Sequence, residues 1–184
     1  MKKKKKLIII VGKSGAGKST FIQAMGFPEK YHCVLSRPMV KYLRQENKKI
    51  SHDDIHKLAQ DWYKQDRYWQ VKYLFDQLQG KDFLIVDGLR YAFELEYLRK
   101  YFPDSVAVVK IIATPEIRYQ RLRKRKKIPI GCREEFLRLE YDESQDMDLE
   151  ILLDQANFTV KNMESFSNFR KKAHEFAFYM RMEG

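Results

Sequence analysis

The residues with the clearest chemical meaning form a glycine-rich segment near the start of the chain. The segment reads Gly12-Lys13-Ser14-Gly15-Ala16-Gly17-Lys18-Ser19 and continues with Thr20. This is the complete G-x-x-x-x-G-K-[ST] spacing, in which glycines let the backbone curl and direct successive N–H groups at phosphate oxygens. We therefore predict that residues 12–20 bind the phosphates of a nucleoside triphosphate, with ATP as the donor.

Individual side chains in this loop have distinct expected roles. Lys18 should reach the β- and γ-phosphates, the Ser19 hydroxyl should ligate Mg²⁺, and Thr20 should support the α-phosphate. A short apolar run, Leu7–Val11, precedes the loop and a helical pattern follows it. That context favours a real phosphate site over a glycine-rich turn that matches by chance, because the N-terminus of the helix adds its positive end to the site.

A second apolar run, Phe83–Val86, ends at Asp87. A carboxylate at the end of a second strand is typical of the residue that holds Mg²⁺ beside the phosphate loop of nucleotide-binding proteins. We therefore predict that Asp87 and Ser19 share the metal. No acidic residue follows Asp87, which argues against motor and transporter ATPases. The absence of an Asn-Lys-x-Asp motif weakens a regulatory GTPase.

The apolar runs predict the fold class. Continuous runs rich in branched residues fit strands that are buried on both faces of a parallel sheet. They cover Leu7–Val11, Cys33–Leu35, Phe83–Val86, Val106–Ala113 and Phe158–Val160. With helical patterns between them, they predict an α/β fold of the P-loop NTPase type: a three-layer αβα sandwich around a central parallel sheet of five strands. Ligands bind beyond the carboxyl ends of such strands, so Gly12 and Asp87 should share one edge.

Three helical segments have identifiable signals. Ser51 with Asp54 three residues later is a capping-box arrangement, and apolar residues then recur at helical spacing as far as Leu78, which predicts a helix with a core-facing stripe. Pro115 fits the first turn of another helix. An amphipathic pattern from Phe166 to Met180 predicts a last helix. We expect residues 7–184 to form a single domain behind a basic tail of residues 1–6.

At this point the sequence resembles the nucleoside monophosphate kinase-like group of P-loop phosphotransferases, which includes adenylate kinase and dephospho-coenzyme A kinase. The resemblance rests on the phosphate loop, on Asp87-Gly88-Leu89-Arg90, which is similar to the Asp-Gly-Phe-Pro-Arg segment of adenylate kinases, and on residues 115–125, which are similar to the helix that leads into their lid. A small set of dephospho-coenzyme A kinase-like proteins is a closer match, because they also carry Val-Asp-Gly-x-Arg.

The resemblance implies site residues beyond the phosphate loop. Arg90 would grip the phosphate of the acceptor, and Arg121 and Arg125 would lie over the donor. Arg44 resembles the acceptor-site arginine of the first mobile helix, with Arg37 as the rival. Acceptor-binding helices are expected over about 37–79 and a lid-like segment over about 126–146. The missing Phe-Pro and the short lid segment argue against adenylate kinase activity itself.

Several further basic residues surround these arginines. Arg118, Arg121 and Arg125 fall on one helical face, and guanidinium groups meet phosphate as bidentate forks. We expect Arg123, Lys124, Lys126 and Lys127 to be solvated. Arg133 and Arg138 lie in a charged helical segment that could close over the donor, as lids do in this chemistry.

Composition limits the partners. The net charge of +11 attracts phosphate, whether on nucleotides, RNA or lipid. The two cysteines, Cys33 and Cys132, are typical of a reduced cytoplasmic protein, and no apolar run approaches the ~20 residues of a membrane span. His52 and His56 lack the further ligands of a zinc site. The sequence carries no signal for an oligomeric state.

The sequence therefore predicts an ATP-dependent kinase that transfers the γ-phosphoryl group to a small phosphorylated acceptor, first of all a nucleoside monophosphate. One alternative is a hydroxyl acceptor, as in dephospho-coenzyme A or a nucleoside. Another is a nucleic-acid-binding NTPase whose runs Lys2–Lys6 and Arg121–Lys127 follow a phosphate backbone. No RNA-binding signature such as the paired aromatic motifs of an RRM supports the last alternative.

Overall fold

The computed structural model describes residues 5–47, 50–125, 130–145 and 148–182. Its centre is a sheet of five parallel strands in the order β2-β3-β1-β4-β5, as the apolar runs predict. The strands are β1 (Lys6–Val11), β2 (His32–Val34), β3 (Phe83–Asp87), β4 (Val106–Ile112) and β5 (Phe158–Lys161). Strands β1, β3 and β4 are strongly apolar because helices cover both of their faces.

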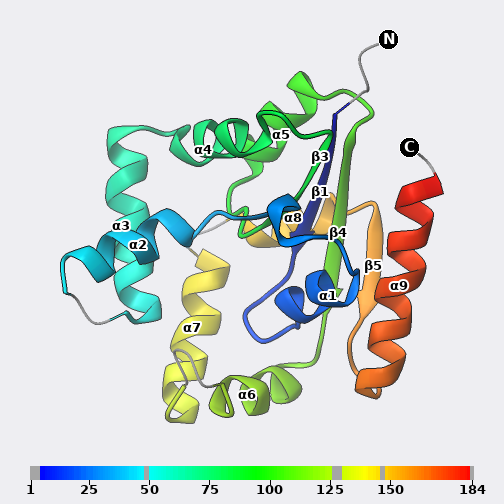
Figure 1. Cartoon of the computed structure of the whole chain (residues 1–184). Coiled ribbons are helices and arrows are strands. Elements are labelled where there is room, and N and C mark those ends of the chain that lie inside the picture. Colours follow the sequence, from blue (N-terminus) through cyan, green and yellow to red (C-terminus); the bar gives the residue numbers. More distant parts are fainter. Residues whose placement is uncertain (1–4, 48–49, 126–129, 146–147, 183–184) are drawn as a thin grey trace.

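The helices complete the three layers of the predicted sandwich (Figure 1). Buried side chains of α4, α5 and α8 pack on one face of the sheet, and those of α1 and α9 pack on the other. The helices are α1 (Lys18–Ala24), α2 (Arg37–Gln45), α3 (His52–Gln65), α4 (Trp69–Leu78), α5 (Ala92–Tyr101), α6 (Pro115–Arg123), α7 (Arg133–Gln145), α8 (Leu149–Asp154) and α9 (Phe166–Met182). None of the helices within the described ranges is long and apolar enough to cross a membrane.

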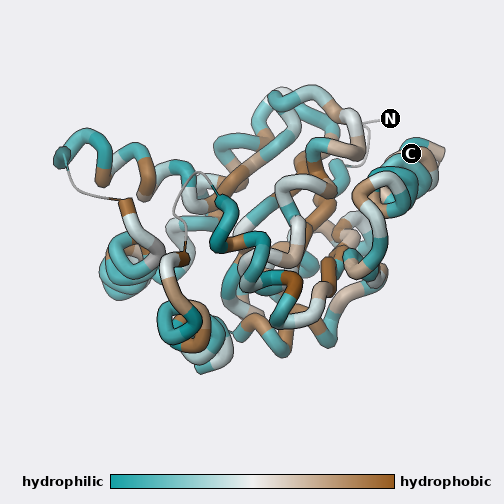
Figure 2. Tube along the Cα trace, turned by 90° about the horizontal axis from the view of Figure 1, so that it is seen from below, coloured by the Kyte–Doolittle hydropathy of each residue, from teal (hydrophilic) through white to brown (hydrophobic). Residues whose placement is uncertain are grey.

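Four of the described helices, α2, α3, α6 and α7, contribute no buried side chain to the two cores that flank the sheet. Figure 1 shows α2, α3 and α7 beside it, close to the end from which the phosphate loop emerges. Hydrophilic residues prevail along the outer helices, whereas hydrophobic ones gather around the strands (Figure 2). The arrangement leaves α2, α3 and α7 available to wall a cavity at the carboxyl edge of the sheet.

The register of the sheet brings the two predicted phosphate-site segments together. Strand β1 lies between β3 and β4, and Ile10 pairs with Asp87. Gly12 follows β1 within two residues of that pair, so the phosphate loop and Asp87 share one edge of the sheet. This confirms the expectation drawn from the two apolar runs.

The structure corrects the single helix predicted from Ser51 to Leu78. The capping box is present, with the Ser51 hydroxyl accepting from the Asp54 N–H at 3.1 Å. The helix nevertheless ends at Gln65. The next residue, Asp66, has an extended backbone, and its carboxylate accepts from the Tyr68 N–H and from Lys72. This local turn separates α3 from α4. Apolar spacing continued across the break because each helix contributes its own apolar face.

Candidate active site

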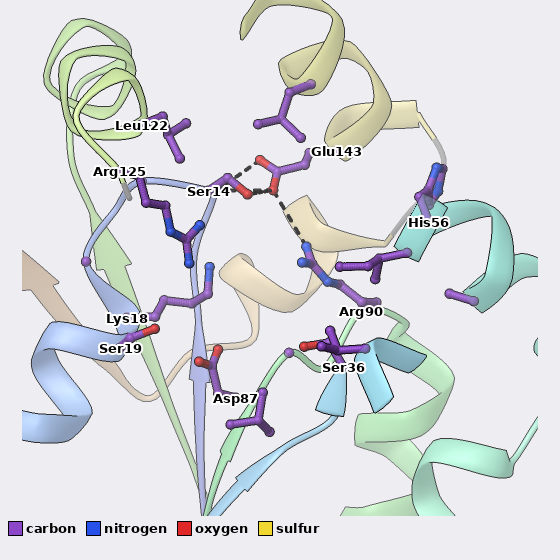
Figure 3. A pocket seen from close by; sticks show the side chains of 18 of the residues that line it. Ser14, Lys18, Ser19, Ser36, His56, Asp87, Arg90, Leu122, Arg125 and Glu143 are labelled. Atoms are coloured by element: carbon purple, nitrogen blue, oxygen red, sulfur yellow. Dashed lines mark hydrogen bonds and ion pairs between the residues drawn. The ribbon is translucent and has the colours of Figure 1, made fainter. Parts of the chain in front are cut away.

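A cavity of about 990 Å³ lies at the carboxyl edge of the sheet, large enough for two small ligands. Its walls come from the phosphate loop, the ends of β2 and β3, and helices α2, α3, α6 and α7. Figure 3 shows part of this wall, with Lys18, Ser19 and Asp87 close together and Arg90 and Arg125 pointing towards the same space. The predicted residues that line the cavity are Ser14, Gly15, Gly17, Lys18, Ser19, Thr20, Arg44, Asp87, Arg90, Arg121 and Arg125.

Some predicted site residues do not line the cavity. Gly12 and Ala16 belong to the loop but do not line the cavity, and a Cβ on Gly12 would come within 2.5 Å of the Ile111 carbonyl oxygen. Lys13 forms a 2.7 Å ion pair with Glu150 of α8. The Lys13 side chain therefore supports the loop from outside, although its backbone belongs to the loop.

The structure separates the two rival acceptor arginines. Arg37 begins α2, is 53% exposed and pairs with Glu29 at 3.5 Å, away from the cavity. Arg44 is near the end of the same helix and lines the cavity. The geometry therefore places Arg44, rather than Arg37, where an acceptor could meet it.

The phosphate loop is held by a residue that sequence reasoning missed. Asn162 directly follows β5 and is buried; its Nδ2 donates to the Ala16 carbonyl at 2.7 Å, and its backbone N–H donates to Ile112. A Cβ on Gly17 would come within 2.3 Å of that Nδ2, and Gly17 has φ 108°, so glycine is required there. The signal in the sequence was a lone asparagine just beyond the last apolar run.

Arg121 both lines the cavity and braces the loop. Its guanidinium donates to the Asn162 carbonyl and side-chain oxygens at 3.1 and 3.2 Å and to the Ala16 carbonyl at 3.4 Å. Burial lowers the pKa of Arg121 from its usual value. The fixed position of this positive charge next to the loop suits a group that must meet phosphate without reorganising.

Lys18 is curled against the loop. Its Nζ donates to the Gly12 carbonyl at 2.6 Å and to Lys13 at 3.4 Å. Burial lowers the pKa of Lys18, and the positive charge of Arg90 acts in the same direction, whereas the Asp87 carboxylate opposes the shift. The ammonium is therefore held among loop carbonyls at the place where an anion would enter.

Asp87 and Ser19 fit a magnesium ion. Asp87 is 8% exposed at the end of β3, and no described residue donates a hydrogen bond to its carboxylate, so its oxygens can accept a cation. The described ranges contain no cluster of three or more His, Cys, Asp or Glu that would hold a metal by protein ligands alone. Mg²⁺ suits this sparse arrangement because it usually takes one or two protein ligands and completes its shell with phosphate oxygens and water.

Glu143 is the most consequential residue that sequence reasoning missed. It belongs to α7, is 1% exposed, and both of its oxygens lie 3.1 Å from the Ser14 N–H; Oε1 also accepts from the Ser14 hydroxyl at 2.6 Å. Arg90 lies 3.7 Å away (Figure 3). Burial raises the pKa of Glu143, but the charges of Arg90 and Lys18 and the bonds from Ser14 outweigh it, and the net shift is downward. The carboxylate thus stands in for phosphate oxygens on the loop.

Arg118 and Arg133 pair with carboxylates of neighbouring helices. Arg118 is buried and forms a bidentate pair with Glu140 of α7, with 2.6 Å between Nη2 and Oε2, and it donates to the Ser14 carbonyl at 3.4 Å. It therefore joins α6, α7 and the loop.

Arg133 pairs with Glu116 at 2.8 Å. Neither Arg133 nor Arg138 lines the cavity; α7 instead faces it with Leu139, Asp142 and Glu143. Residues 126–129 and 146 of the expected lid lie outside the described residues.

The apolar stripe of α3 differs from its prediction. Ile55, Ala59 and Tyr63 are only half-buried and line the cavity, so this face is not part of the core. The Tyr63 hydroxyl donates to Glu94 Oε1 at 2.7 Å.

Glu94 connects α3 to the segment that carries Arg90. Its second oxygen accepts from the backbone N–H groups of Tyr91 at 3.3 Å and Arg90 at 3.5 Å. Burial raises the pKa of Glu94 to about 7. Through Tyr63 and Glu94, α3 is therefore tied to the segment that carries Arg90.

Comparisons with known proteins give a family model and several curated relatives. A family model described as AAA domain matches residues 8–148. A UPF0200 protein of Methanocaldococcus jannaschii is 30% identical over 128 residues, which cover 65% of this chain and 62% of that protein. A UPF0200/UPF0201 protein of Archaeoglobus fulgidus is 28% identical over 92 residues, 50% of this chain and 28% of that protein. The chain thus spans less than two thirds of the length of these relatives.

Solved structures with a similar fold include kinases. A shikimate kinase from Bacteroides thetaiotaomicron has a TM-score of 0.60 at 14% identity, covering 93% of this chain and 97% of that one. A gluconokinase from Sinorhizobium meliloti 1021 has a TM-score of 0.57 at 15% identity, covering 97% and 95%. At this identity the likeness concerns the fold, which is that of P-loop kinases, as the sequence resemblance predicts.

Proposed function

Because the chain belongs to the AAA domain family and has the fold of P-loop kinases, we propose that it is an ATP-dependent kinase acting on a small phosphorylated acceptor, first of all a nucleoside monophosphate. One observation carries the proposal. The same cavity has the phosphate loop in one part of its wall and two arginines from other segments, Arg44 and Arg90, in another. Such a site offers separate positive groups to two anionic ligands.

The donor side uses the loop and the arginines of α6. Backbone N–H groups from residues 14–19 hold the β- and γ-phosphates, and Lys18 and Arg121 offset the charge that develops during transfer. Arg125 lies beyond the end of α6, is exposed and lines the cavity. It adds positive charge over the donor.

Ser19 and Asp87 would hold Mg²⁺, which supplies charge neutralisation on the β- and γ-oxygens. Asp87 also lies within electrostatic reach of Lys18. These two side chains thus fix the position of the donor relative to the sheet edge.

The transfer itself needs alignment more than covalent chemistry by the protein. An oxygen of the acceptor phosphate attacks the γ-phosphorus, the bond to the β,γ-bridging oxygen breaks, and ADP leaves with that electron pair. The acceptor becomes a diphosphate. Arg90 and Arg44 bring the two anions together and offset their repulsion, since guanidinium binds phosphate through paired N–H groups.

Two carboxylates of the cavity wall, Glu143 and Asp87, favour a phosphate acceptor over a hydroxyl. A hydroxyl acceptor calls for a general base whose pKa is near the working pH. Glu143 lies beside Arg90. Burial raises the pKa of Glu143, but Arg90, Lys18 and the hydrogen bonds from Ser14 lower it by more, so the pKa lies below its usual value. Asp87 is assigned to the metal. A monophosphate is largely ionised at pH 7, since its second pKa is ~6, and needs no base.

An assay of ADP release tests the proposal. The acceptors are the nucleoside monophosphates, the nucleosides, dephospho-coenzyme A, shikimate, gluconate and a short RNA. We expect at least one monophosphate to be used well and the nucleosides to be poor acceptors. Preference for a hydroxyl acceptor with all monophosphates inert would overturn the acceptor assignment, and hydrolysis stimulated only by RNA would support a nucleic-acid-dependent NTPase.

Arginine variants refine the same test. Arg90→Ala should raise the KM for the acceptor about tenfold or more while the KM for ATP stays within about twofold, because one charge-assisted phosphate contact is lost. Arg37→Ala is the matched control, since Arg37 belongs to α2 but lies away from the cavity. Equal effects of the two substitutions would contradict the role of Arg90.

A further inference from the structure

The side chain of Glu94 is completely enclosed by the protein beside the cavity. Glu94 belongs to the first turn of α5 and is 0% exposed. Its Oε1 accepts from the Tyr63 hydroxyl at 2.7 Å, and its Oε2 accepts from the backbone N–H groups of Tyr91 and Arg90 at 3.3 and 3.5 Å. Tyr63, Tyr91 and Arg90 all line the cavity. A buried acid therefore lies directly behind three residues that a ligand would meet.

The surroundings of Glu94 make both of its protonation states accessible near neutral pH. Burial raises the pKa of Glu94 to about 7, although hydrogen bonds from Tyr63 and from the backbone of Tyr91 and Arg90 oppose the shift, as does the positive charge of Arg90. From the start of α8, the Asp148 carboxylate accepts a backbone N–H of the same turn at 2.9 Å. The charge of Arg90 is the contribution that a ligand can offset, because Arg90 points into the cavity (Figure 3).

An anion bound to Arg90 shifts this balance in one direction. A phosphate on the guanidinium offsets the positive charge that helps to keep Glu94 ionised, and it also repels the buried carboxylate. Both effects raise the pKa of Glu94. Because linkage is reciprocal, a higher pKa in the complex means that binding takes up a proton, and that the protonated protein binds the anion more tightly.

The Tyr63 hydroxyl changes its partner when Glu94 is protonated. Burial raises the pKa of Tyr63, so its hydroxyl keeps its hydrogen at neutral pH. An ionised carboxylate only accepts hydrogen bonds, whereas a carboxylic acid has an O–H to donate. Oε2 of Glu94 faces two N–H donors, so the added proton belongs on Oε1, where it donates to the Tyr63 oxygen. The hydroxyl hydrogen of Tyr63 is then available to a ligand in the cavity.

From these contacts, we propose that acceptor binding is linked to a proton: Glu94 takes up one proton from solvent when a phosphate binds to Arg90, and the Tyr63 hydroxyl turns from Glu94 to that phosphate. The inference rests on the proposed function and adds to it a ligand contact, Tyr63, and a positioning residue, Glu94. No bond of the acceptor changes in this step, and the proton returns to solvent when the product leaves.

This linkage sets the pH range of the acceptor site. The acceptor phosphate must be ionised, and its second pKa is ~6, whereas Glu94 must be protonated. The acceptor is therefore bound best between pH values of about 6 and 7, and binding weakens above this range as Glu94 ionises.

Calorimetry measures the proton directly. AMP, CMP, GMP and UMP are each titrated into the full chain saturated with Mg²⁺ and a non-hydrolysable ATP analogue, at pH 7.5, in two buffers that differ in ionisation enthalpy. If binding raises the pKa of Glu94 by about one unit, the parent protein should take up about half a proton per nucleotide, and its Kd should rise about three- to fivefold from pH 7 to 8.5. The monophosphates are largely ionised throughout this range and contribute little themselves.

Glu94→Gln is the decisive variant, because an amide resembles the protonated acid: its NH₂ donates to Tyr63 and its oxygen accepts the backbone N–H groups. It should bind the nucleotide within about twofold of the parent at pH 7, take up no proton and keep the same Kd to pH 8.5. Glu96→Gln is the matched control, since Glu96 is an exposed residue of the same helix, and it should behave as the parent does. Circular dichroism confirms the fold of each variant.

Tyr63→Phe tests the ligand contact. The substitution keeps the ring at the cavity wall but removes the hydroxyl. It should weaken nucleotide binding about three- to tenfold at pH 6.5, because one hydrogen bond to the acceptor is lost, and leave the affinity for the ATP analogue unchanged. Equal nucleotide affinity in Tyr63→Phe and the parent would overturn this contact.

The remaining outcomes decide the role of Glu94. Uptake that is present in the parent and in Glu96→Gln but absent in Glu94→Gln supports the inference. No uptake by the parent, or uptake that persists in Glu94→Gln, overturns it, and loss of the uptake in His56→Gln would then assign the proton to that cavity residue. If none of the four nucleotides binds, the acceptor class is wrong and the inference fails with it. These measurements need no turnover, so they are separate from the ADP-release assay that decides the proposed function.

Discussion

Glu143 and Ser14 are 129 residues apart in sequence, yet the Glu143 carboxylate accepts hydrogen bonds from both the backbone N–H and the hydroxyl of Ser14, the latter at 2.6 Å. The N–H groups of this loop are the groups that bind phosphate in nucleotide sites. The carboxylate is 1% exposed and also faces Arg90. Helix α7 therefore rests on the loop through a carboxylate that occupies a backbone N–H which a bound phosphate would also use.

This contact predicts that Glu143→Gln binds ATP more tightly, by about three- to tenfold. The amide keeps the size of the side chain but removes the negative charge that repels the γ-phosphate, and such repulsion is worth on the order of 1 kcal/mol in a partly screened site. Titration with a fluorescent ATP analogue measures the change. Glu134→Gln, on the exposed first turn of the same helix, is the control and should have no effect. Unchanged or weaker binding by Glu143→Gln would show that the carboxylate does not compete.

Lys18→Ala should retain the fold and lose at least about a hundredfold in turnover, or ~2.7 kcal/mol of barrier. The reason is that Lys18 supplies the charge at the transferring phosphate. Lys13→Ala is a closely matched control, because Lys13 belongs to the same loop but pairs with Glu150 outside the cavity. Steady-state assays with circular dichroism of each variant decide the matter. A loss of less than tenfold in Lys18→Ala would refute its role in transfer.

Asp87→Asn should move the Mg²⁺ dependence of the reaction to higher concentrations, by about tenfold, and lower the maximal rate. The amide keeps one oxygen ligand but loses the charge that a hard cation prefers. The measurement is a Mg²⁺ titration at saturating ATP. An unchanged profile would mean that Asp87 merely ends β3 and shapes the turn to Gly88.

Glu94 predicts a specific pH dependence of stability. Burial raises its folded-state pKa from the usual 4.5 to about 7, although the hydrogen bonds from Tyr63 and Tyr91 oppose the shift. Between these two values the folded protein binds more protons than the unfolded chain, so the free energy of unfolding falls as pH rises through this window. Relative to Glu94→Gln, the parent should lose about 1 to 3 kcal/mol between pH 4.5 and 7.5. Denaturant melts across this range provide the check, and parallel curves for the two proteins would contradict it.

The sequence was sufficient for the centre of the sheet because the strands there, β1, β3 and β4, are largely buried. A continuous apolar run predicts a two-sided burial environment, and the positions of β1, β3 and β4 follow from it. The phosphate loop was equally accessible to sequence reasoning, since its glycines and its lysine have a fixed spacing. The strands and the phosphate loop are both determined by residues that are close together in the sequence.

The partners across the cavity could not be predicted in the same way. Glu143 lies in a charged helix where its neighbours Asp142 and Ser144 are equally polar, and only the docking of α7 selects it. Arg118 and Arg121 share the expected helical face, yet Arg118 pairs with Glu140 and Arg121 with Asn162. The break between α3 and α4 at Asp66 was not predicted, because the apolar spacing continues across it and the turn depends on one carboxylate, which accepts from the Tyr68 N–H.

The central claim is that phosphate passes from ATP to a second phosphate in this cavity, and phosphorus NMR tests it most directly. The protein is incubated with ATP, Mg²⁺ and each nucleoside monophosphate in turn, and the products are followed by their ³¹P resonances, with Lys18→Ala as the control. The account predicts that, for at least one monophosphate, the monophosphate signal declines while two diphosphates form, ADP and the new nucleoside diphosphate, and that Lys18→Ala forms neither. ATP that yields only ADP and inorganic phosphate, whichever monophosphate is present, would contradict it.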